Sequence, residues 1–233
     1  MSDGPVKYES EGNVAVITMD DGKANALSYA MMDAVGAALQ RATKEASAVV
    51  LAGRAGRFCA GFDLREMASG LDQARALVTR GAGFLLELYQ HPQPLVVACT
   101  GHALAGGALT VLTGDVRIGT PGAFKIGLNE VQIGMPVPIL AMELARDRLE
   151  KKYLIAATLF GQVVDPETAL QWGYLDRLEP AENLRTVAVA EAAKLGAIAN
   201  SAYAKTKAAL RERTAKYVQD TLVIDMQRLT PPA

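Results

Sequence analysis

The stretches Phe58-Cys59-Ala60-Gly61-Phe62-Asp63 and Gly101-His102-Ala103-Leu104-Ala105-Gly106-Gly107 decide the fold of this chain. Each glycine-bearing loop follows a β-rich run, and the second loop opens into a helical pattern. A lone carboxylate, Glu130, follows in the segment 126–130. Backbone N–H groups from two such loops can converge on one oxygen atom. The pattern therefore predicts an oxyanion hole with an acid/base group within reach.

The composition is that of a globular protein with a sizeable core. Half of the 233 residues are hydrophobic and 21% are charged, which excludes wholesale disorder. The formal net charge of −1 gives no electrostatic reason for a nucleic-acid or anionic-membrane partner. Apolar runs are too short to span a bilayer, and the first residues lack the regions of a signal peptide. We therefore expect a cytoplasmic protein that binds neither nucleic acid nor membrane.

The sequence predicts neither a disulfide nor a bound metal. Cys59 and Cys99 each lie in an apolar run, which is typical of buried, reduced thiols. Cysteine, histidine and aspartate do not cluster at metal-ligand spacing. The glycines do not form a dinucleotide fingerprint after the first strand, so a nicotinamide cofactor is not expected either.

The first half of the chain alternates strands and helices. Residues 5–19 alternate apolar and polar side chains around Gly12-Asn13, which predicts a β-hairpin. Ser28 is a suitable N-cap for a helix that ends near Glu45. Further strands are predicted at 47–52, 95–99 and 115–119, with helices at 71–90 and 106–113. This alternation predicts an α/β fold with parallel strand pairing.

From residue 138 onward the pattern becomes helical. The segments 142–157, 166–171, 181–195 and 202–227 carry helical periodicity with almost no strand signal. In the last of them, Ala209, Tyr217, Leu222 and Ile224 require cover from the core or from a neighbouring subunit. We place a boundary near residue 180, which gives a core of residues 1–180 and a C-terminal helical region of residues 181–233.

Taken in order, these segments resemble the crotonase superfamily, the enoyl-CoA hydratase/isomerase family. The matching segments lie at 23–27 (KANAL), 57–64 (RFCAGFDL), 100–107 (TGHALAGG), 129–134 (NEVQIG) and 169–175 (ALQWGYL). The resemblance implies a crotonase-like spiral of ββα turns followed by a helical oligomerisation region, assembled as a homotrimer or hexamer. It also implies acyl-CoA thioester substrates. Coenzyme A is then part of the substrate, and no separate cofactor is expected.

The resemblance also assigns roles to single residues. It implies that the backbone N–H groups of Phe62 and Gly106 form the oxyanion hole. It places Lys23, Ala24 and Ala60 along the coenzyme A, with the Ala60 carbonyl at the adenine.

Basic side chains near these segments are candidates for the phosphates of coenzyme A. Arg65, Lys23 and Arg54 can each make charge-assisted hydrogen bonds to a phosphate. Any one of them alone is also compatible with an ordinary solvated surface charge.

One departure from the family pattern decides the predicted chemistry. Hydratases of the family carry two glutamates, of which the second maps onto Glu130 and the first onto Leu109. Hydration needs a water to be held, deprotonated and added while a proton reaches the α-carbon. Moving a double bond needs one base that carries a proton from C2 to C4. The sequence therefore predicts a Δ3,Δ2-enoyl-CoA isomerase with Glu130 as base and Leu109 in the acyl pocket.

Alternatives remain open at this point. A 2-enoyl-CoA hydratase is possible if Asp63 or Glu66 replaces the missing glutamate, and a non-catalytic acyl-CoA-binding protein also fits its absence. Glu130 itself has a plain alternative as a surface or capping glutamate. His102 is expected to hydrogen-bond to the backbone rather than to act as an acid or base. The sequence leaves the acyl chain length and the pathway undetermined.

Overall fold

The computed structural model describes residues 4–229. The strands are β1 (Val6–Glu11), β2 (Val14–Met19), β3 (Ala48–Gly53), β4 (Gly56–Cys59), β5 (Leu95–Cys99), β6 (Gly101–Leu104), β7 (Val116–Gly119), β8 (Ile126–Gly127) and β9 (Arg177–Leu178). The helices are α1 (Tyr29–Glu45), α2 (Leu64–Ala68), α3 (Leu71–Tyr89), α4 (Gly106–Leu112), α5 (Ile139–Arg148), α6 (Leu154–Thr158), α7 (Pro166–Trp172), α8 (Ala181–Gly196) and α9 (Ser201–Arg228).

Two sheets share the strands and confirm the predicted α/β fold. The larger sheet has the order β1-β2-β3-β5-β7-β9, in which β1 and β2 form the predicted antiparallel hairpin and the other pairs are parallel. The smaller sheet has the order β4-β6-β8. The chain supplies one strand to each sheet in turn, β3 then β4, β5 then β6, and β7 then β8. This alternation is the spiral of ββα turns that the resemblance implies.

Local signals placed most of the helices correctly. Ser28 caps α1 by accepting a hydrogen bond from the N–H of Met31 at 3.2 Å. The prediction of one helix over 142–157 is wrong, because α5 ends at Arg148 and a 3₁₀ turn at Lys151–Tyr153 precedes α6. The N–H of Glu150 donates to the carbonyl of Trp172 at 3.0 Å. This contact with the end of α7 takes the place of the next helical hydrogen bond and turns the chain.

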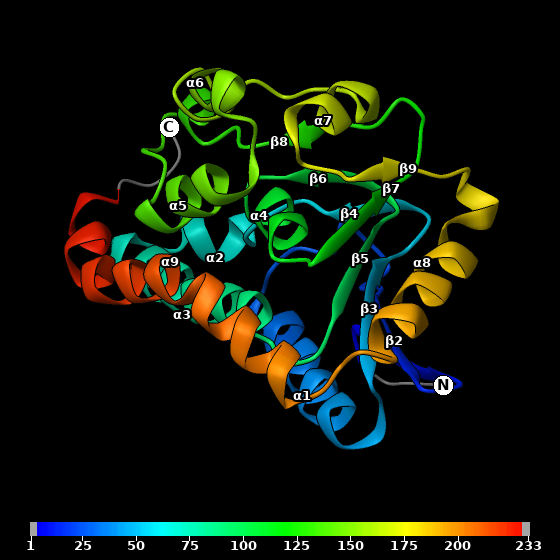
Figure 1. The fold of residues 1–233 in the computed structure, drawn as a ribbon. Coiled ribbons are helices and arrows are strands. Elements are labelled where there is room, and N and C mark those ends of the chain that lie inside the picture. The colour runs from blue at the N-terminus through cyan, green and yellow to red at the C-terminus, as the bar shows by residue number, and fades with distance from the viewer. Residues whose placement is uncertain (1–3, 230–233) are drawn as a thin grey trace.

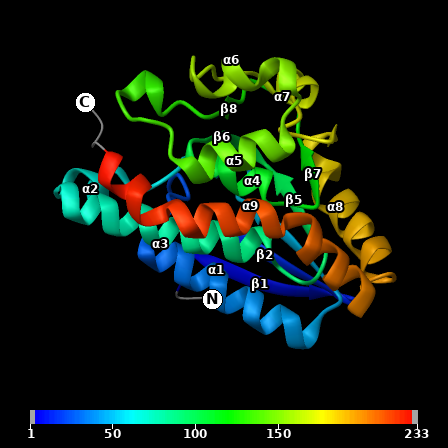
Figure 2. The ribbon, with the colours of Figure 1, turned by 60° about the vertical axis from the view of Figure 1, so that its left-hand side comes forward.

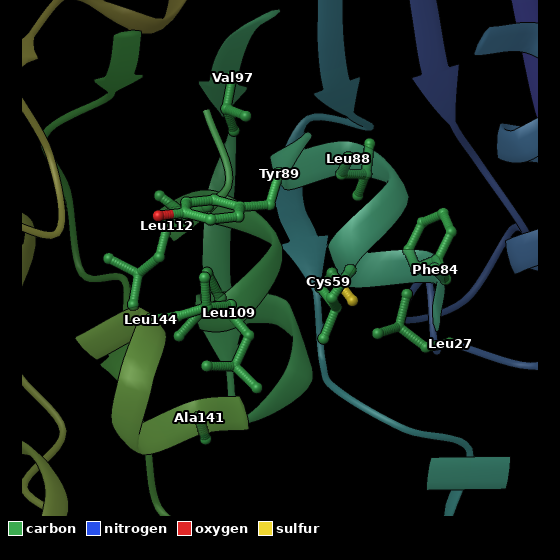
Figure 3. Close-up of a cluster of buried hydrophobic side chains, with 14 of the residues drawn as sticks. Leu27, Cys59, Phe84, Leu88, Tyr89, Val97, Leu109, Leu112, Ala141 and Leu144 are labelled. Carbon is green, nitrogen blue, oxygen red and sulfur yellow. The ribbon is translucent and has the colours of Figure 1, made fainter. Parts of the chain in front are cut away.

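Helices cover both faces of the larger sheet. Figure 1 shows α8 on one side of the sheet and α1, α3 and α9 on the other. On the α8 side, Leu184, Ala188 and Ala192 pack against strand residues such as Val16 and Val50. On the other side lies the larger core, part of which Figure 3 shows between α3, α4 and α5.

The last helix, α9, runs beside α3 and α5 (Figure 2). Its buried residues are partly polar: Lys207, Arg211, Ala215, Val218, Asp225 and Met226. The predicted apolar set does not face the core of its own chain, because Ala209, Tyr217 and Ile224 are exposed and Leu222 is partly buried; cover by a neighbouring subunit stays a prediction. The boundary near residue 180 stays a prediction, and α8 and α9 follow it.

A buried carboxylate explains why α9 turns a polar face inward. Asp115, directly before β7, pairs with Lys207 at 2.6 Å and with Arg211 at 2.7 Å. It also accepts the N–H of Leu95 at 2.7 Å. Removing one partner from such a buried pair typically costs about 3–5 kcal/mol, because the other charge stays buried. This cluster fixes α9 against the sheet. No described helix is long and apolar enough to cross a bilayer.

Candidate active site

A cavity of about 320 Å³ lies where the two glycine-bearing loops meet α9. Both loops, the segment around Glu130 and the end of α9 contribute lining residues, most of which are apolar. The chain's own last helix therefore supplies part of the wall, through Leu222, Asp225 and Met226. Segments far apart in the sequence build one largely apolar site.

The first loop leaves the N–H of Phe62 free. Leu27 pairs with the loop through its own N–H, which donates to the Gly61 carbonyl at 2.8 Å, and through its carbonyl, which accepts the Asp63 N–H at 3.4 Å. These bonds use the groups on either side of Phe62. Within residues 4–229, the Phe62 N–H has no hydrogen-bond acceptor.

The second loop places the N–H of Gly106 next to the first loop. Gly106 is the first residue of α4, where backbone N–H groups have no partner inside the helix. Ala105 before it has φ +48° and ψ −120°, a conformation that costs about 1–3 kcal/mol for a residue with a side chain. A Cβ placed on Gly61 would lie 3.4 Å from the Gly106 nitrogen, so the two loops are in contact.

Glu130 is the carboxylate that the sequence singled out, and it lines this cavity. Its side chain is 6% exposed, and its Oε2 atom has no hydrogen-bond partner among the described residues. Burial raises the pKa of the Glu130 carboxyl to about 7. The side chain does not cap the short 3₁₀ helix that follows, so the surface or capping interpretation is wrong. A base with this pKa is half ionised near neutral pH.

Leu109 occupies the position that the resemblance assigns to the first glutamate of a hydratase. It lies three residues after Gly106 on α4, is 2% exposed and lines the cavity. Figure 3 shows it between α4 and α5, in the buried cluster that also contains Leu112 and Ala141. Leu109 is thus both a cavity wall and a core residue, and it offers no group that can exchange a proton.

The carboxylates proposed as substitutes for that glutamate lie elsewhere. Asp63 caps α2 by accepting the N–H of Arg65 at 2.8 Å, and neither Asp63 nor Glu66 is among the residues that line the cavity. Asp225 of α9 does line the cavity and is 7% exposed. It accepts the N–H of Ile139 at 2.7 Å, and burial raises the pKa of its carboxyl.

Sequence reasoning missed Asp225. Asp225 could have been noticed as a single acidic residue between apolar neighbours, in Leu222-Val223-Ile224-Asp225-Met226. A charged residue inside such a run is buried only where it has a partner. The partner is the backbone N–H of Ile139 at the start of α5. No sequence pattern predicts that this N–H and Asp225 lie close together.

The residues expected along coenzyme A lie close together, with one exception. The carbonyl of Lys23 accepts the Nε–H of Arg54 at 2.9 Å, and the carbonyl of Ala24 accepts the N–H of Ala60 at 3.1 Å. Ala60 also lines the cavity. Arg65 is exposed on α2 and is not among the lining residues. Hydrogen bonds thus connect Lys23 with Arg54 and Ala24 with Ala60, and of these four residues Ala60 lines the cavity.

Asn25 fastens this group to the first glycine-bearing loop. It is fully buried at φ +53°, and its amide donates to the carbonyls of Met19 at 2.9 Å and Phe58 at 3.2 Å. The sequence showed Asn25 inside a family segment but gave it no role. A polar residue between alanines and a leucine was the available signal.

The other reactive side chains have structural roles. His102 accepts the Lys125 N–H on its Nδ1 atom at 3.0 Å, as expected. Cys59 and Cys99 are buried free thiols, also as expected, and burial raises the pKa of both to about 12. Within the described residues, no group of three or more His, Cys, Asp or Glu side chains is arranged to hold a metal ion.

Comparisons with known proteins match this chain over almost its whole length. A family profile described as "Enoyl-CoA hydratase/isomerase" matches residues 9–231. The chain is similar to human mitochondrial enoyl-CoA delta isomerase 1, with 30% identity over 95% of this chain and 75% of the relative. It is similar to a probable enoyl-CoA hydratase of Rhizobium meliloti, with 28% identity over 90% and 82%. A solved enoyl-CoA hydratase/isomerase family protein from Pseudomonas syringae has a TM-score of 0.94 and 38% identity, over 97% of this chain and 98% of that chain.

Proposed function

Because the chain belongs to the enoyl-CoA hydratase/isomerase family, we propose that it is a Δ3,Δ2-enoyl-CoA isomerase. The observation that carries this choice is that Glu130 and Leu109 line the same cavity. Isomerisation needs one base that carries a proton between two carbons, which Glu130 can do beside the inert Leu109. Hydration needs a second polar group that holds the water. Relatives named for isomerisation and for hydration both match. The choice between the two activities therefore depends on Leu109, which stands where a hydratase would carry its first glutamate.

The proposed reaction moves one proton. The ionised Glu130 carboxylate takes a proton from C2 of the 3-enoyl thioester, and the electrons move to the thioester oxygen to give a dienolate. The N–H groups of Phe62 and Gly106 stabilise the oxygen charge, and losing one such donor typically costs about 3 kcal/mol of barrier. Glu130 then returns the proton to C4, which leaves the double bond between C2 and C3.

The environment of Glu130 suits both steps. With a pKa of about 7, the carboxylate is a stronger base than an exposed glutamate and its acid form can still give the proton back. The apolar walls keep water from the dienolate. Leu109 carries no acidic proton, so it cannot protonate the dienolate at a carbon other than C4. We therefore expect kcat/KM for isomerisation to rise with pH through about 7 and then to level off.

A second candidate function, 2-enoyl-CoA hydratase, is favoured by one observation. Asp225 lines the same cavity as Glu130 and is itself a carboxyl with a raised pKa. It could supply the second acid or base that Leu109 lacks. Its Oδ2 atom already accepts the Ile139 N–H, which argues for a structural role instead.

Turnover of two substrates by three proteins tests these alternatives. For the wild type we expect isomerisation of 3-hexenoyl-CoA and no hydration of 2-hexenoyl-CoA. Glu130→Gln should lower isomerisation by roughly 10²–10⁴-fold, while Asp225→Asn should keep most of it. Hydration that disappears in Asp225→Asn would instead make the enzyme a hydratase. Tight binding of coenzyme A thioesters without turnover of either substrate would identify a non-catalytic member.

We also propose that the protein works as a homotrimer or a hexamer. Leu210, Tyr217 and Ile224 are exposed on α9 at intervals of seven residues, so they share one face of that helix. An apolar helical face of this kind is suited to contact with a second subunit.

A further inference from the structure

A second cavity lies next to the one at Glu130. It has a volume of about 180 Å³ and lies between the start of α5 and the end of α9, which run side by side (Figure 2). Pro138, Asp225 and Met226 line both cavities. The two cavities are therefore neighbours, and these three residues form the partition between them.

Two of the three partition residues are held in place. Pro138 has a ring that fixes its φ, here −61°, directly before α5. Asp225 accepts the N–H of Ile139 at 2.7 Å. Met226 is 7% exposed, and its unbranched side chain with three rotatable bonds adapts readily to its surroundings. Met226 is thus the part of the partition that can move.

The walls of the second cavity suit a hydrocarbon. The described residues that line it beyond the partition are Pro136, Val137, Ile139, Met142, Leu229 and, as the charged one, Arg228. Burial raises the pKa of Asp225, and the nearby charge of Arg228 opposes this shift. An anionic chain end would have to lie beside the Asp225 carboxyl as well as beside Arg228. The cavity therefore favours an uncharged, apolar chain.

The cavity at Glu130 is small for a long acyl chain. Ligand pockets typically have volumes of about 300–1,000 Å³, and this cavity, with about 320 Å³, lies near the lower limit. The proposed reaction already places the thioester at Phe62 and the carbons C2 to C4 at Glu130. A longer chain that passes Met226 gains the additional volume of about 180 Å³.

On the basis of the isomerase function proposed above, we propose that the second cavity receives the end of a long acyl chain and that Met226 determines the chain length that the site accepts. The Met226 side chain turns aside, and the chain end lies against Val137, Met142 and Leu229. The substrate class is then long-chain 3-enoyl-CoA with an unsubstituted hydrocarbon tail. Each methylene that leaves water for these walls strengthens binding up to about fourfold.

Saturated acyl-CoAs test this proposal without any turnover. Hexanoyl-, decanoyl- and tetradecanoyl-CoA are titrated by calorimetry below the concentrations at which they form micelles, and tetradecanoyl-CoA is co-crystallised with the full-length protein. For the wild type we expect tetradecanoyl-CoA to bind at least tenfold more tightly than decanoyl-CoA, with its chain end in the second cavity. Equal affinity of these two, or a chain that leaves the first cavity by another route, would overturn the proposal.

The same titrations separate this proposal from the proposed function. A protein that isomerises 3-hexenoyl-CoA but binds decanoyl- and tetradecanoyl-CoA equally would keep the isomerase function and lose the role of the second cavity. An affinity that rises with chain length, in a protein that turns over no enoyl-CoA, would do the reverse. Failure to bind any of the three acyl-CoAs would overturn both.

Three single exchanges locate the end of the chain. Met142→Trp fills the second cavity from a residue that does not line the first, and it should lower the affinity ratio of tetradecanoyl-CoA to hexanoyl-CoA at least tenfold. Met226→Ala shortens the partition and should raise this ratio. Met67→Ala, at a residue that lines the first cavity but not the second, is the matched control and should keep the wild-type ratio. The wild-type ratio in both Met142→Trp and Met226→Ala would overturn the proposal.

Discussion

The carboxylate of Asp225, near the end of α9, accepts the backbone N–H of Ile139 at the start of α5 with a distance of 2.7 Å. Asp225 lines the cavity at Glu130, and so do Pro138 and Leu140 on either side of Ile139. The first N–H groups of a helix have no partner inside it and favour a negative charge. One partly buried hydrogen bond therefore joins the last helix to the start of α5, and both segments line the candidate active site.

Asp225→Ala should loosen this wall. The Ile139 N–H would lose its acceptor, which costs about 1–3 kcal/mol of folding free energy, and α9 would hold the acyl cavity less firmly. We expect KM for 3-hexenoyl-CoA to rise more than kcat falls, and Asp225→Asn, which keeps an acceptor oxygen, to recover most of the loss. Steady-state kinetics and urea unfolding measure both effects.

Asp220→Asn, on the exposed side of α9, is the control for that pair of variants. A kcat that collapses in Asp225→Asn at unchanged KM and stability would contradict the structural role and point to Asp225 as a catalytic acid.

Gly81 of α3 should be essential for the position of Phe62. A Cβ on Gly81 would lie 2.1 Å from Cε1 of the Phe62 ring, so alanine there forces the ring to move, and we expect this shift to displace the Phe62 backbone as well. Displacing an oxyanion donor by a fraction of an ångström lowers kcat/KM, and we expect a loss of roughly 10- to 100-fold.

Gly83→Ala in the same helix is the matched control, because nothing lies within 4 Å of its Cβ position. This exchange should keep the activity and stabilise the exposed helix by up to about 1 kcal/mol. Equal kinetics for the Gly81→Ala and Gly83→Ala variants would contradict the prediction that Gly81 holds the Phe62 backbone in its active position.

Glu130→Gln should stabilise the protein at alkaline pH. Burial raises the pKa of Glu130 from 4.5 to about 7 in the folded state, so the folded protein binds more protons than the unfolded chain between these values. Its contribution to stability is present below pH 4.5, falls as the pH rises to 7 and is lost above it. The variant should therefore gain up to ~3 kcal/mol at pH 8 and little at pH 4.5.

Denaturant unfolding of both proteins across this pH range measures the difference. A stability difference that is independent of pH would mean that the Glu130 carboxyl titrates normally and lies open to solvent.

The exposed apolar face of α9 should hold the subunits together. The double exchange Leu210→Lys and Ile224→Lys places two charges on this face and should convert a trimer to monomers in light scattering. Glu212→Lys on another face of the helix adds the same kind of charge and should leave the mass unchanged. A wild-type protein that is already monomeric would contradict the proposed assembly.

Local sequence patterns predicted the elements that build the oxyanion loops. The hairpin, the Ser28 cap and the strands before both loops all have signals within a few residues, and the family resemblance supplied their order. Glu130 could be singled out because it is the lone carboxylate in the segment that follows the second glycine-bearing loop. These signals are short-range, and the structure agrees with them.

The contacts of the C-terminal half could not be predicted in this way. The inward face of α9 is set by Asp115, which is 92 residues from Lys207 and 96 from Arg211. The break after Arg148 depends on the Trp172 carbonyl. Asp225 is buried because of a backbone group 86 residues away. Each depends on a partner distant in sequence, so local periodicity gave one wrong helix, no role for Asp225 and no sign of the polar face that α9 turns to the core.

The central claim is that one carboxyl group, Glu130, carries the proton from C2 to C4. Turnover of 3-hexenoyl-CoA deuterated at C2, in ordinary water, tests this claim most directly, with mass spectrometry of the 2-hexenoyl-CoA formed in the first turnovers. Because Glu130 is enclosed in the cavity, we predict that a measurable fraction of the product carries deuterium at C4. Hydrogen from solvent at C4 in every product molecule, with turnover that persists in Glu130→Gln, would contradict it.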